Sequence, residues 1–118
     1  MAEAVQIEEA SPHPRTRVLR IAGRLDAKNA QVLVNRCHEL RDEGVRSIVL
    51  NLHDVSFVAS SGIGSLLALT ETFKDGQESL RLADLSGAVS SVVELLNLGQ
   101  FLEIARTEDE ALAAAGRA

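Results

Sequence analysis

The sequence predicts an α/β protein in which a small mixed β-sheet packs against about four α-helices. Two extended segments at the start follow each other with no helix between them, which is typical of an antiparallel hairpin. After them, segments with apolar residues at every third or fourth position alternate with short apolar segments, as in strand–helix–strand units. The 118 residues provide one hydrophobic core, so we expect a single domain over residues 1–118.

Two strands and a helix are expected in the first part of the chain. Residues 5–8 and 17–22 alternate apolar and polar side chains, and the Ser-Pro-His-Pro segment at 11–14 provides the turn between them. Asp26 is placed to cap a helix that Gly44 ends. The residues expected to face the core from this helix recur three and four positions apart: Ala30, Leu33, Val34, Cys37 and Leu40.

The middle of the chain continues the alternation. Residues 47–52 and 80–83 are expected to form strands, with a helix between them over about residues 61–74 that Asp75 and Gly76 stop. Right-handed crossovers of this kind make the later strands parallel. The helix residues expected to face inward are Ile63, Leu66, Leu67 and Thr70, with Phe73 near the end.

The last part predicts two more helices. Ser86 caps the first of them, and residues 97–99 end it. Residues 101–104 form a short extended piece, and Thr107 with Glu110 three residues later is a capping box that opens an alanine-rich helix. The apolar residues expected on one face of the third helix are Val89, Val92, Val93 and Leu96.

Residues 57–64, Phe-Val-Ala-Ser-Ser-Gly-Ile-Gly, join an apolar strand to the start of a helix. A serine at the cap position satisfies one free N–H group of the first turn, and the partial positive charge there stabilises an anion. Gly62 and Gly64 remove side-chain bulk on both sides of Ser61, so another protein could approach the hydroxyls closely. We therefore expect Gly62→Arg to block binding and leave the fold intact. A capped helix without any further role is the alternative interpretation.

Three segments leave the carboxyl ends of the predicted parallel strands: 23–26, 58–62 and 83–86. Because ligand and partner sites of open α/β sheets form at this rim, we expect the three segments to converge there. This expectation favours a functional role for Ser60 and Ser61.

Composition excludes several classes of partner. A net charge of −5 argues against nucleic acid or anionic lipid, and three Phe with no Trp or Tyr leave little for stacking on bases. Residues 1–6 lack the basic start of a secretory signal, and no window approaches the ~20 apolar residues of a membrane span. Cys37 is the only cysteine, so no internal disulfide can form. We expect a soluble cytoplasmic protein.

Catalytic chemistry finds little support in the sequence. His13, His38 and His53 lie in a turn, on a helix and before the serines, and none has the spacing of a metal ligand set or of a serine hydrolase. The glycines match neither the dinucleotide fingerprint nor the P-loop. We expect no enzyme activity, no cofactor and no metal.

Several of these segments together resemble the STAS domain of bacterial anti-sigma factor antagonists. Residues 48–52, 54–57 and 60–64 look like its signature, and the Gly-Arg-Leu-Asp segment at 23–26 resembles its Gly-x-Leu-Asp element. Residues 85–99 resemble its third helix with a closing Leu-Gly. The resemblance covers nearly the whole chain in order.

The resemblance implies a switch protein. In its unphosphorylated form it would bind an anti-sigma factor that is also a serine kinase, free the sigma factor, and be reset by a protein phosphatase. The phosphoacceptor falls on Ser60, with Ser61 as second choice, and Asp26 falls on a partner-docking acid. The family often has Asp before the phosphorylated serine, where this chain has Ala59. The implied partner-binding residues are Asp26, Val58, Ala59, Ser60, Ser61, Gly62 and Gly64.

A STAS adaptor subunit is the alternative function. Such a subunit of a lipid-transport ATPase complex or a stress-signalling assembly would use the serine pair only for docking. STAS domains of anion transporters share the fold but are attached to membrane spans. A neighbouring gene for a kinase-like anti-sigma factor would favour the switch, and genes for a permease and an ATPase would favour the adaptor.

Overall fold

The structure is a computed structural model that describes residues 5–115. Its strands form one sheet in the sequential order β1-β2-β3-β4-β5, with β1 antiparallel to β2 and every later pair parallel. The predicted α/β fold, a hairpin followed by parallel crossovers, is confirmed. The elements are β1 Gln6–His13, β2 Thr16–Leu25, α1 Ala27–Asp42, β3 Ser47–Val58, α2 Ser60–Asp75, β4 Ser79–Ala83, α3 Gly87–Leu95, the 3-10 turn η1 Leu98–Gln100, β5 Ile104–Ala105 and α4 Glu108–Ala115.

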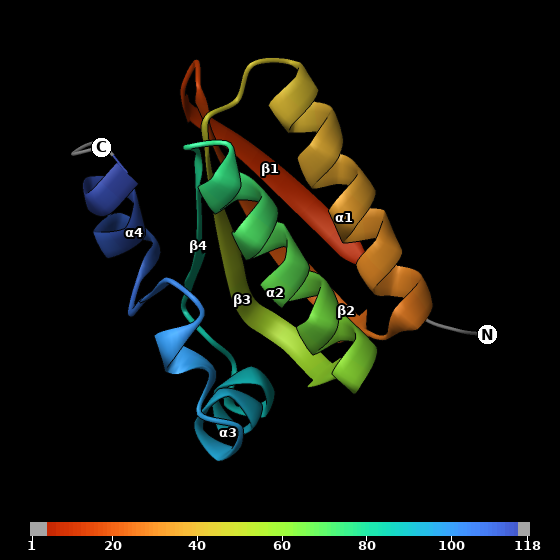
Figure 1. Ribbon diagram of the computed structural model, residues 1–118. Coiled ribbons are helices and arrows are strands. Elements are labelled where there is room, and N and C mark those ends of the chain that lie inside the picture. The colour runs from red at the N-terminus through yellow and green to blue at the C-terminus, as the bar shows by residue number, and fades with distance from the viewer. Residues whose placement is uncertain (1–4, 116–118) are drawn as a thin grey trace.

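The sheet has helices on both faces (Figure 1). Neighbouring strand residues point to opposite faces, and the core divides accordingly. Leu19 and Leu50 belong to the large cluster that α1, α2 and α3 cover, whereas Val18 and Val49 belong to a small cluster with Ala111 of α4. One face therefore carries three helices and most of the core, and the opposite face carries α4 over small side chains.

The predicted helix signals act as expected at three of the four helix starts. The Asp26 carboxylate accepts the Asn29 N–H at 3.0 Å at the start of α1, and Gly44 ends that helix with a positive φ of +100°. At α3, the Ser86 hydroxyl accepts the Val89 N–H at 3.3 Å. The corresponding contacts at α4 are Glu110 N–H to the Thr107 hydroxyl at 3.2 Å and Arg106 N–H to the Glu110 carboxylate at 3.2 Å.

Four sequence-based boundaries were wrong. β2 continues to Leu25, so residues 23–25, which were expected to leave the strand, are paired with β3. β1 continues to His13 through a register shift after Ala10, so residues 11–13 are strand and the turn is confined to Pro14 and Arg15. β3 continues to Val58 because its second half pairs with β2 alone. The predicted last strand is present but begins later than residue 101, since Phe101 closes η1 and β5 is Ile104–Ala105.

Cys37 lies in the core, as its place on the apolar stripe of α1 predicted. Its side chain has 0% exposure, and burial raises the pKa of the thiol to about 12. Desolvation disfavours the thiolate, which is the reactive form, so this cysteine acts as a small apolar side chain. Leu96, also predicted to face inward, is instead exposed.

Candidate functional site

The carboxyl ends of β2 and β3 lie side by side and start the candidate site. Leu25 and Val58 are register partners, and the Ala59 N–H donates to the Leu25 carbonyl at 2.9 Å. Beyond this pair the two chains separate, one into α1 through Asp26 and the other into α2 through Ala59. The strand pairing therefore brings the start of α1 and the start of α2 together.

The third predicted segment of the rim lies elsewhere. β4 ends beside the middle of β3, where Ala83 pairs with Asn51 and the Ser86 N–H donates to the Leu52 carbonyl at 3.2 Å. Val58 lies six positions beyond Leu52 on β3, roughly 20 Å of extended chain. The predicted convergence of three segments was wrong for residues 83–86, because β3 extends well beyond the end of β4.

The start of α2 differs from the prediction in a way that matters for an anion. The residue at the N-cap is Ala59, with extended backbone and no side-chain cap, whereas a serine was expected to provide the cap. Ser60 and Ser61 are the first two residues inside the helix, and both are exposed. An α-helix leaves its first N–H groups without backbone partners, so those of this first turn can donate to a negatively charged group.

Gly62 and Gly64 have opposite surroundings. Gly62 is buried, and a Cβ there would lie closer than 3.0 Å to the Leu25 carbonyl oxygen, whereas a Cβ at Gly64 would meet nothing within 4 Å. Gly62 therefore lets α2 pack on the end of β2, and only Gly64 presents accessible backbone. The expectation that Gly62 opens the surface to a partner was wrong, and an arginine there would displace the helix.

Asp26 holds the other side of the site. It is half-buried, and its capping bond fixes the carboxylate at the start of α1, directly after the residue that bonds Ala59. Val58 is only 8% exposed and belongs to the core beneath the site, while Ala59 is half-exposed. Asp26 and the first turn of α2 thus form one continuous surface at the ends of β2 and β3.

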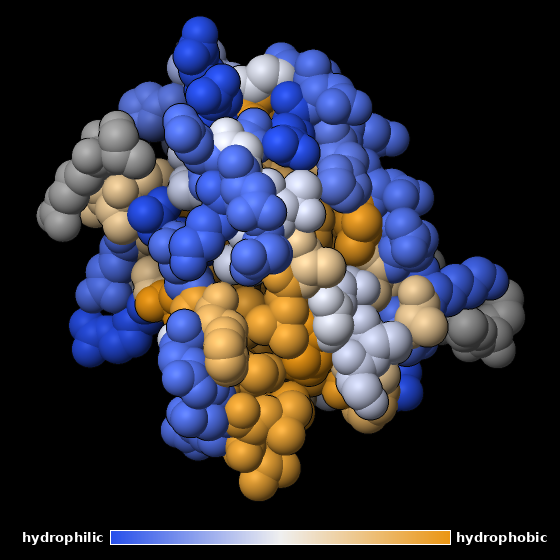
Figure 2. All heavy atoms as spheres, viewed as in Figure 1, coloured by the Kyte–Doolittle hydropathy of each residue, from blue (hydrophilic) through white to orange (hydrophobic). Residues whose placement is uncertain are grey.

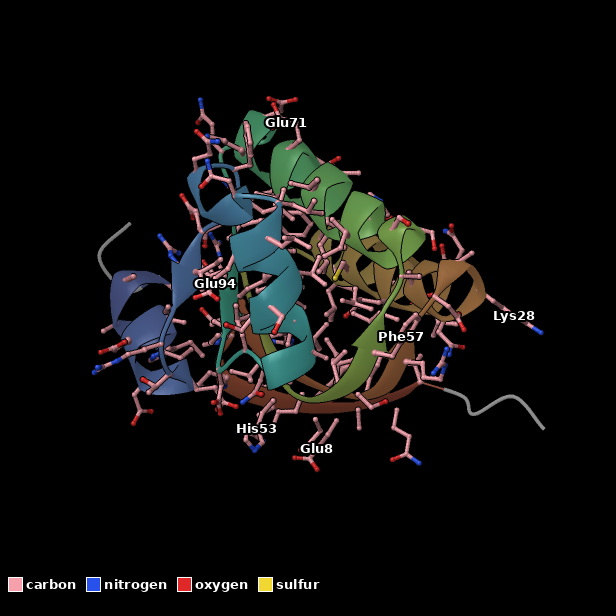
Figure 3. All side chains as sticks on the ribbon, turned by 90° about the horizontal axis from the view of Figure 1, so that it is seen from below. Glu8, Lys28, His53, Phe57, Glu71 and Glu94 are labelled. Atoms are coloured by element: carbon pink, nitrogen blue, oxygen red, sulfur yellow. The ribbon has the colours of Figure 1, made fainter. Side chains whose placement is uncertain are left out.

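Sequence reasoning missed an aromatic contact beside this surface. The Arg24 guanidinium lies 4.1 Å from the centre of the Phe57 ring, and the two residues are register partners on β2 and β3. Phe57 is 40% exposed, and Figure 3 shows it near the end of β3. The sequence did contain a signal for this contact. Arg24 and Phe57 directly precede the apolar residues Leu25 and Val58, so they lie on the opposite face of their strands, where they can meet.

A histidine–carboxylate contact lies just beyond the end of β4, away from the candidate site. His53 lies 3.6 Å from the Asp84 carboxylate through its Nδ1, and Figure 3 shows it pointing outward. Within residues 5–115, no group of three or more His, Cys, Asp or Glu side chains could hold a metal ion. In the same range, none of the helices has the length and apolarity needed to cross a membrane.

The model of the STAS domain matches residues 6–111, so the chain belongs to the STAS domain family, as its motifs predicted. The anti-sigma-B factor antagonist of Staphylococcus aureus strain NCTC 8325 is 22% identical over 86 residues, which are 73% of this chain and 80% of the relative.

Solved structures of anti-sigma factor antagonists share the fold. One from Mycobacterium paratuberculosis has a TM-score of 0.83 at 19% identity, covering 98% of this chain and 99% of the other. Unphosphorylated SpoIIAA has a TM-score of 0.77 at 24% identity, covering 96% and 98%. The phosphorylated form of SpoIIAA from Bacillus has a TM-score of 0.70 at 24% identity, covering 92% and 98%. These relatives belong to the class that the sequence motifs predicted.

Proposed function

We propose that this chain is an anti-sigma factor antagonist whose binding is controlled by phosphorylation of Ser60. The observation that carries the proposal is the uncapped first turn of α2, which exposes two serines and the Gly64 backbone beside the Asp26 carboxylate. The partner is an anti-sigma factor with serine kinase activity, a protein phosphatase reverses the modification, and the chain itself catalyses no reaction. The names of the similar proteins support this class of function.

Phosphorylation at this position would change the surface and leave the fold intact. A phosphoserine adds a charge of about −1.5 to −2, and the free N–H groups of the first turn can donate hydrogen bonds to its phosphate oxygens. A negative charge near a helix N-terminus stabilises a helix by about 0.3–1 kcal/mol. At the interface, the same charge and its water would have to fit where a neutral hydroxyl fitted before. A loss of ~3 kcal/mol there would weaken binding more than a hundredfold.

Ala59 distinguishes this chain from the usual motif of the family. With no carboxylate at the N-cap, a phosphate on Ser60 would meet less repulsion, but a kinase would also lose an acidic group to recognise. Asp26 is an acid that the pairing of β2 with β3 brings to the start of α2, and its bond to the Asn29 N–H fixes it there. We propose that the partner recognises this carboxylate together with the serines.

The test measures binding to each kinase-like anti-sigma factor encoded in the source genome, by titration calorimetry with purified proteins. We expect the wild type and Ser60→Ala to bind, and Ser60→Asp to bind at least a hundredfold more weakly. Ser11→Asp adds the same charge on the exposed edge of β1 and should bind as the wild type does. Asp26→Asn keeps a good helix cap, so weaker binding at unchanged stability would show that the charge is recognised.

Incubation with ATP and the bound kinase, followed by mass spectrometry, assigns the modified residue. Modification of Ser61 alone would move the switch by one position. Equal binding by Ser60→Ala and Ser60→Asp with no modification would contradict the switch and favour an adaptor that only docks.

A further inference from the structure

The end of α3 and the turn after it expose three large apolar side chains. Leu95 is 83% exposed, Leu96 55% and Phe101 60%. We call these three residues the α3 patch. Figure 2 shows a continuous hydrophobic surface over α3. Contiguous exposed apolar surface of this kind marks an interaction site more often than scattered single residues do.

The fold has no use for these side chains. α3 anchors to the core through Val89 and Val93, one helical turn apart, and Leu98 is buried just beyond the helix. Asn97 has a left-handed backbone with φ of 54°, which turns the chain so that Leu98 points inward while the preceding Leu95 and Leu96 stay outside. The core is therefore already complete without the α3 patch.

The surroundings of the α3 patch are negatively charged. The last turn of α3 contains no basic residue, although the carboxyl end of a helix favours cations. Glu94 lies in that turn, on the helix where Figure 3 labels it, and Glu103 follows Phe101 by two residues. Two cations lie nearby: Arg81 contacts Glu103 at 3.7 Å, and Lys74 lines a small hollow of about 40 Å³ beside Phe101. Glu94 and the end of α3 remain without a positive partner among the described residues.

The α3 patch lies on the same side of the molecule as the candidate site. α2 and α3 cover the same face of the sheet, and Figure 2 shows the apolar surface over α3 beside the paler surface of α2. A typical protein interface covers about 800 Å² per partner, a disc roughly 32 Å across. The whole molecule measures 36 × 29 × 24 Å, so one partner seated on the start of α2 can reach the end of α3.

We infer that the α3 patch binds a basic, amphipathic segment of the same anti-sigma factor that docks at Ser60. This inference rests on the proposed function. Apolar side chains of that segment cover Leu95, Leu96 and Phe101, and its Lys or Arg side chains meet Glu94 and the carboxyl end of α3. A second copy of this chain fits less well, because both surfaces would bring the same negative charges together.

A second contact changes how the switch behaves. The charge of a phosphate on Ser60 acts at the start of α2, whereas the α3 patch contributes through buried apolar area. The two contributions should therefore be independent, and the phosphorylated protein keeps a weak, apolar attachment to its partner.

The test is a double-mutant cycle measured by titration calorimetry against the anti-sigma factor that binds the wild type. Leu95→Gln should weaken binding about tenfold, the loss expected when an exposed leucine can no longer be buried. Glu94→Lys should weaken binding several-fold, whereas the matched reversal Asp109→Lys on α4, on the opposite face of the sheet, should not. Leu95→Gln with Ser60→Asp should multiply the two single effects within about twofold. The urea midpoint of each variant shows that its fold is intact.

Each remaining outcome contradicts a defined part of the inference. Wild-type affinity for Leu95→Gln and Glu94→Lys, with weak binding by Ser60→Asp, would overturn the inference and leave the proposed function in place. Absence of binding by the wild type to every anti-sigma factor would overturn both. Self-association of the wild type in sedimentation velocity, abolished by Leu95→Gln, would assign the α3 patch to a second copy instead.

Discussion

Gly62 and Gly64 are two residues apart on α2 and predict opposite effects of the same substitution. Gly62→Ala should destabilise the protein by about 1–3 kcal/mol, because the new methyl group would overlap the Leu25 carbonyl and backbone would have to move. Gly64→Ala should stabilise it by about 0.5–1 kcal/mol, since the site is open and alanine favours the helix. Urea denaturation followed by circular dichroism measures both changes.

The same pair separates stability from binding. If Gly64 presents backbone to the anti-sigma factor, Gly64→Ala should weaken binding while raising the urea midpoint. A stability loss for Gly64→Ala, or none for Gly62→Ala, would contradict the surroundings described for these glycines.

Ala59 predicts a gain in stability at the start of α2. Its backbone has φ −87° and ψ 165°, the extended geometry of an N-cap, but its methyl group accepts no hydrogen bond. Ala59→Asp would place a carboxylate where it can accept an N–H of the first turn, worth about 1 kcal/mol. The urea midpoint should rise, and it should rise less at pH 3, where the carboxyl is largely protonated in the unfolded chain and the contribution of its charge is being lost. An unchanged midpoint at neutral pH would mean that the first turn is satisfied in another way.

Among the elements, α4 depends most on a single cluster of polar side chains. Arg20 on β2 donates to both Glu108 carboxylate oxygens at 2.8 and 2.9 Å, and Asn51 on β3 donates to one of them at 2.6 Å. The apolar contacts under α4 come from small residues such as Val18, Val49 and Ala111. The bond from Arg20 lowers the pKa of Glu108 below its ordinary value of 4.5.

A lowered pKa predicts the pH dependence of the attachment of α4. The charged Glu108 stabilises the folded state fully above pH 4.5, and this contribution is lost as pH falls through the lower pKa of the folded protein. Glu108→Gln should cost about 1 kcal/mol at pH 7, because the Arg20 side of the contact is partly exposed. The difference in urea midpoint between wild type and variant should shrink below pH 4.5. A constant difference down to pH 3 would contradict this account.

The pH dependence of Glu108 has to be read from the difference between the wild-type and Glu108→Gln stability curves. The pKa of Glu9 is also lowered, by its hydrogen bond to Arg36, so the wild type alone loses stability at low pH for two reasons. Subtracting the Glu108→Gln curve removes the Glu9 contribution, because Glu9 and Arg36 are unchanged in the variant.

The order and type of the elements could be predicted from sequence because each has a local signal. Asp26 and Ser86 cap their helices through contacts three residues away, and such contacts are visible in a short window. The length of β3 could not be predicted, because residues after Leu52 stay extended through pairing with β2, far away along the chain. The alternation alone does not show that β4 stops earlier.

For the candidate site, the sequence located a helix start but not the geometry of that start. The Ser-Ser-Gly segment was visible as a helix start, but the position of the cap depends on the bond between Ala59 and Leu25. The same contact explains why residue 62 is a glycine, because any side chain there would overlap the Leu25 carbonyl. Sequence spacing cannot report a contact between segments more than thirty residues apart.

At the scale of the whole molecule, the reactivity of the Cys37 thiol measures how often the core opens. Cys37 has 0% exposure within the cluster that α1, α2 and α3 build on the sheet, and its pKa is raised to about 12. Alkylation requires the thiolate and access to solvent, so both must come from opening of the structure. Because a small domain unfolds with a free energy of about 5 kcal/mol or more, native Cys37 should react at least a thousandfold more slowly than the unfolded chain.

The dependence of this reaction on urea distinguishes two kinds of opening. If α1 separates only with the whole core, the logarithm of the labelling rate at pH 8 should rise with urea with the slope of global unfolding. Iodoacetamide labelling followed by mass spectrometry measures the rate, and Cys37→Ala provides the unlabelled control. A smaller slope would mean that α1 opens alone, which would loosen the cap at Asp26 and make the candidate site mobile. Rapid labelling without urea would contradict the burial of Cys37 itself.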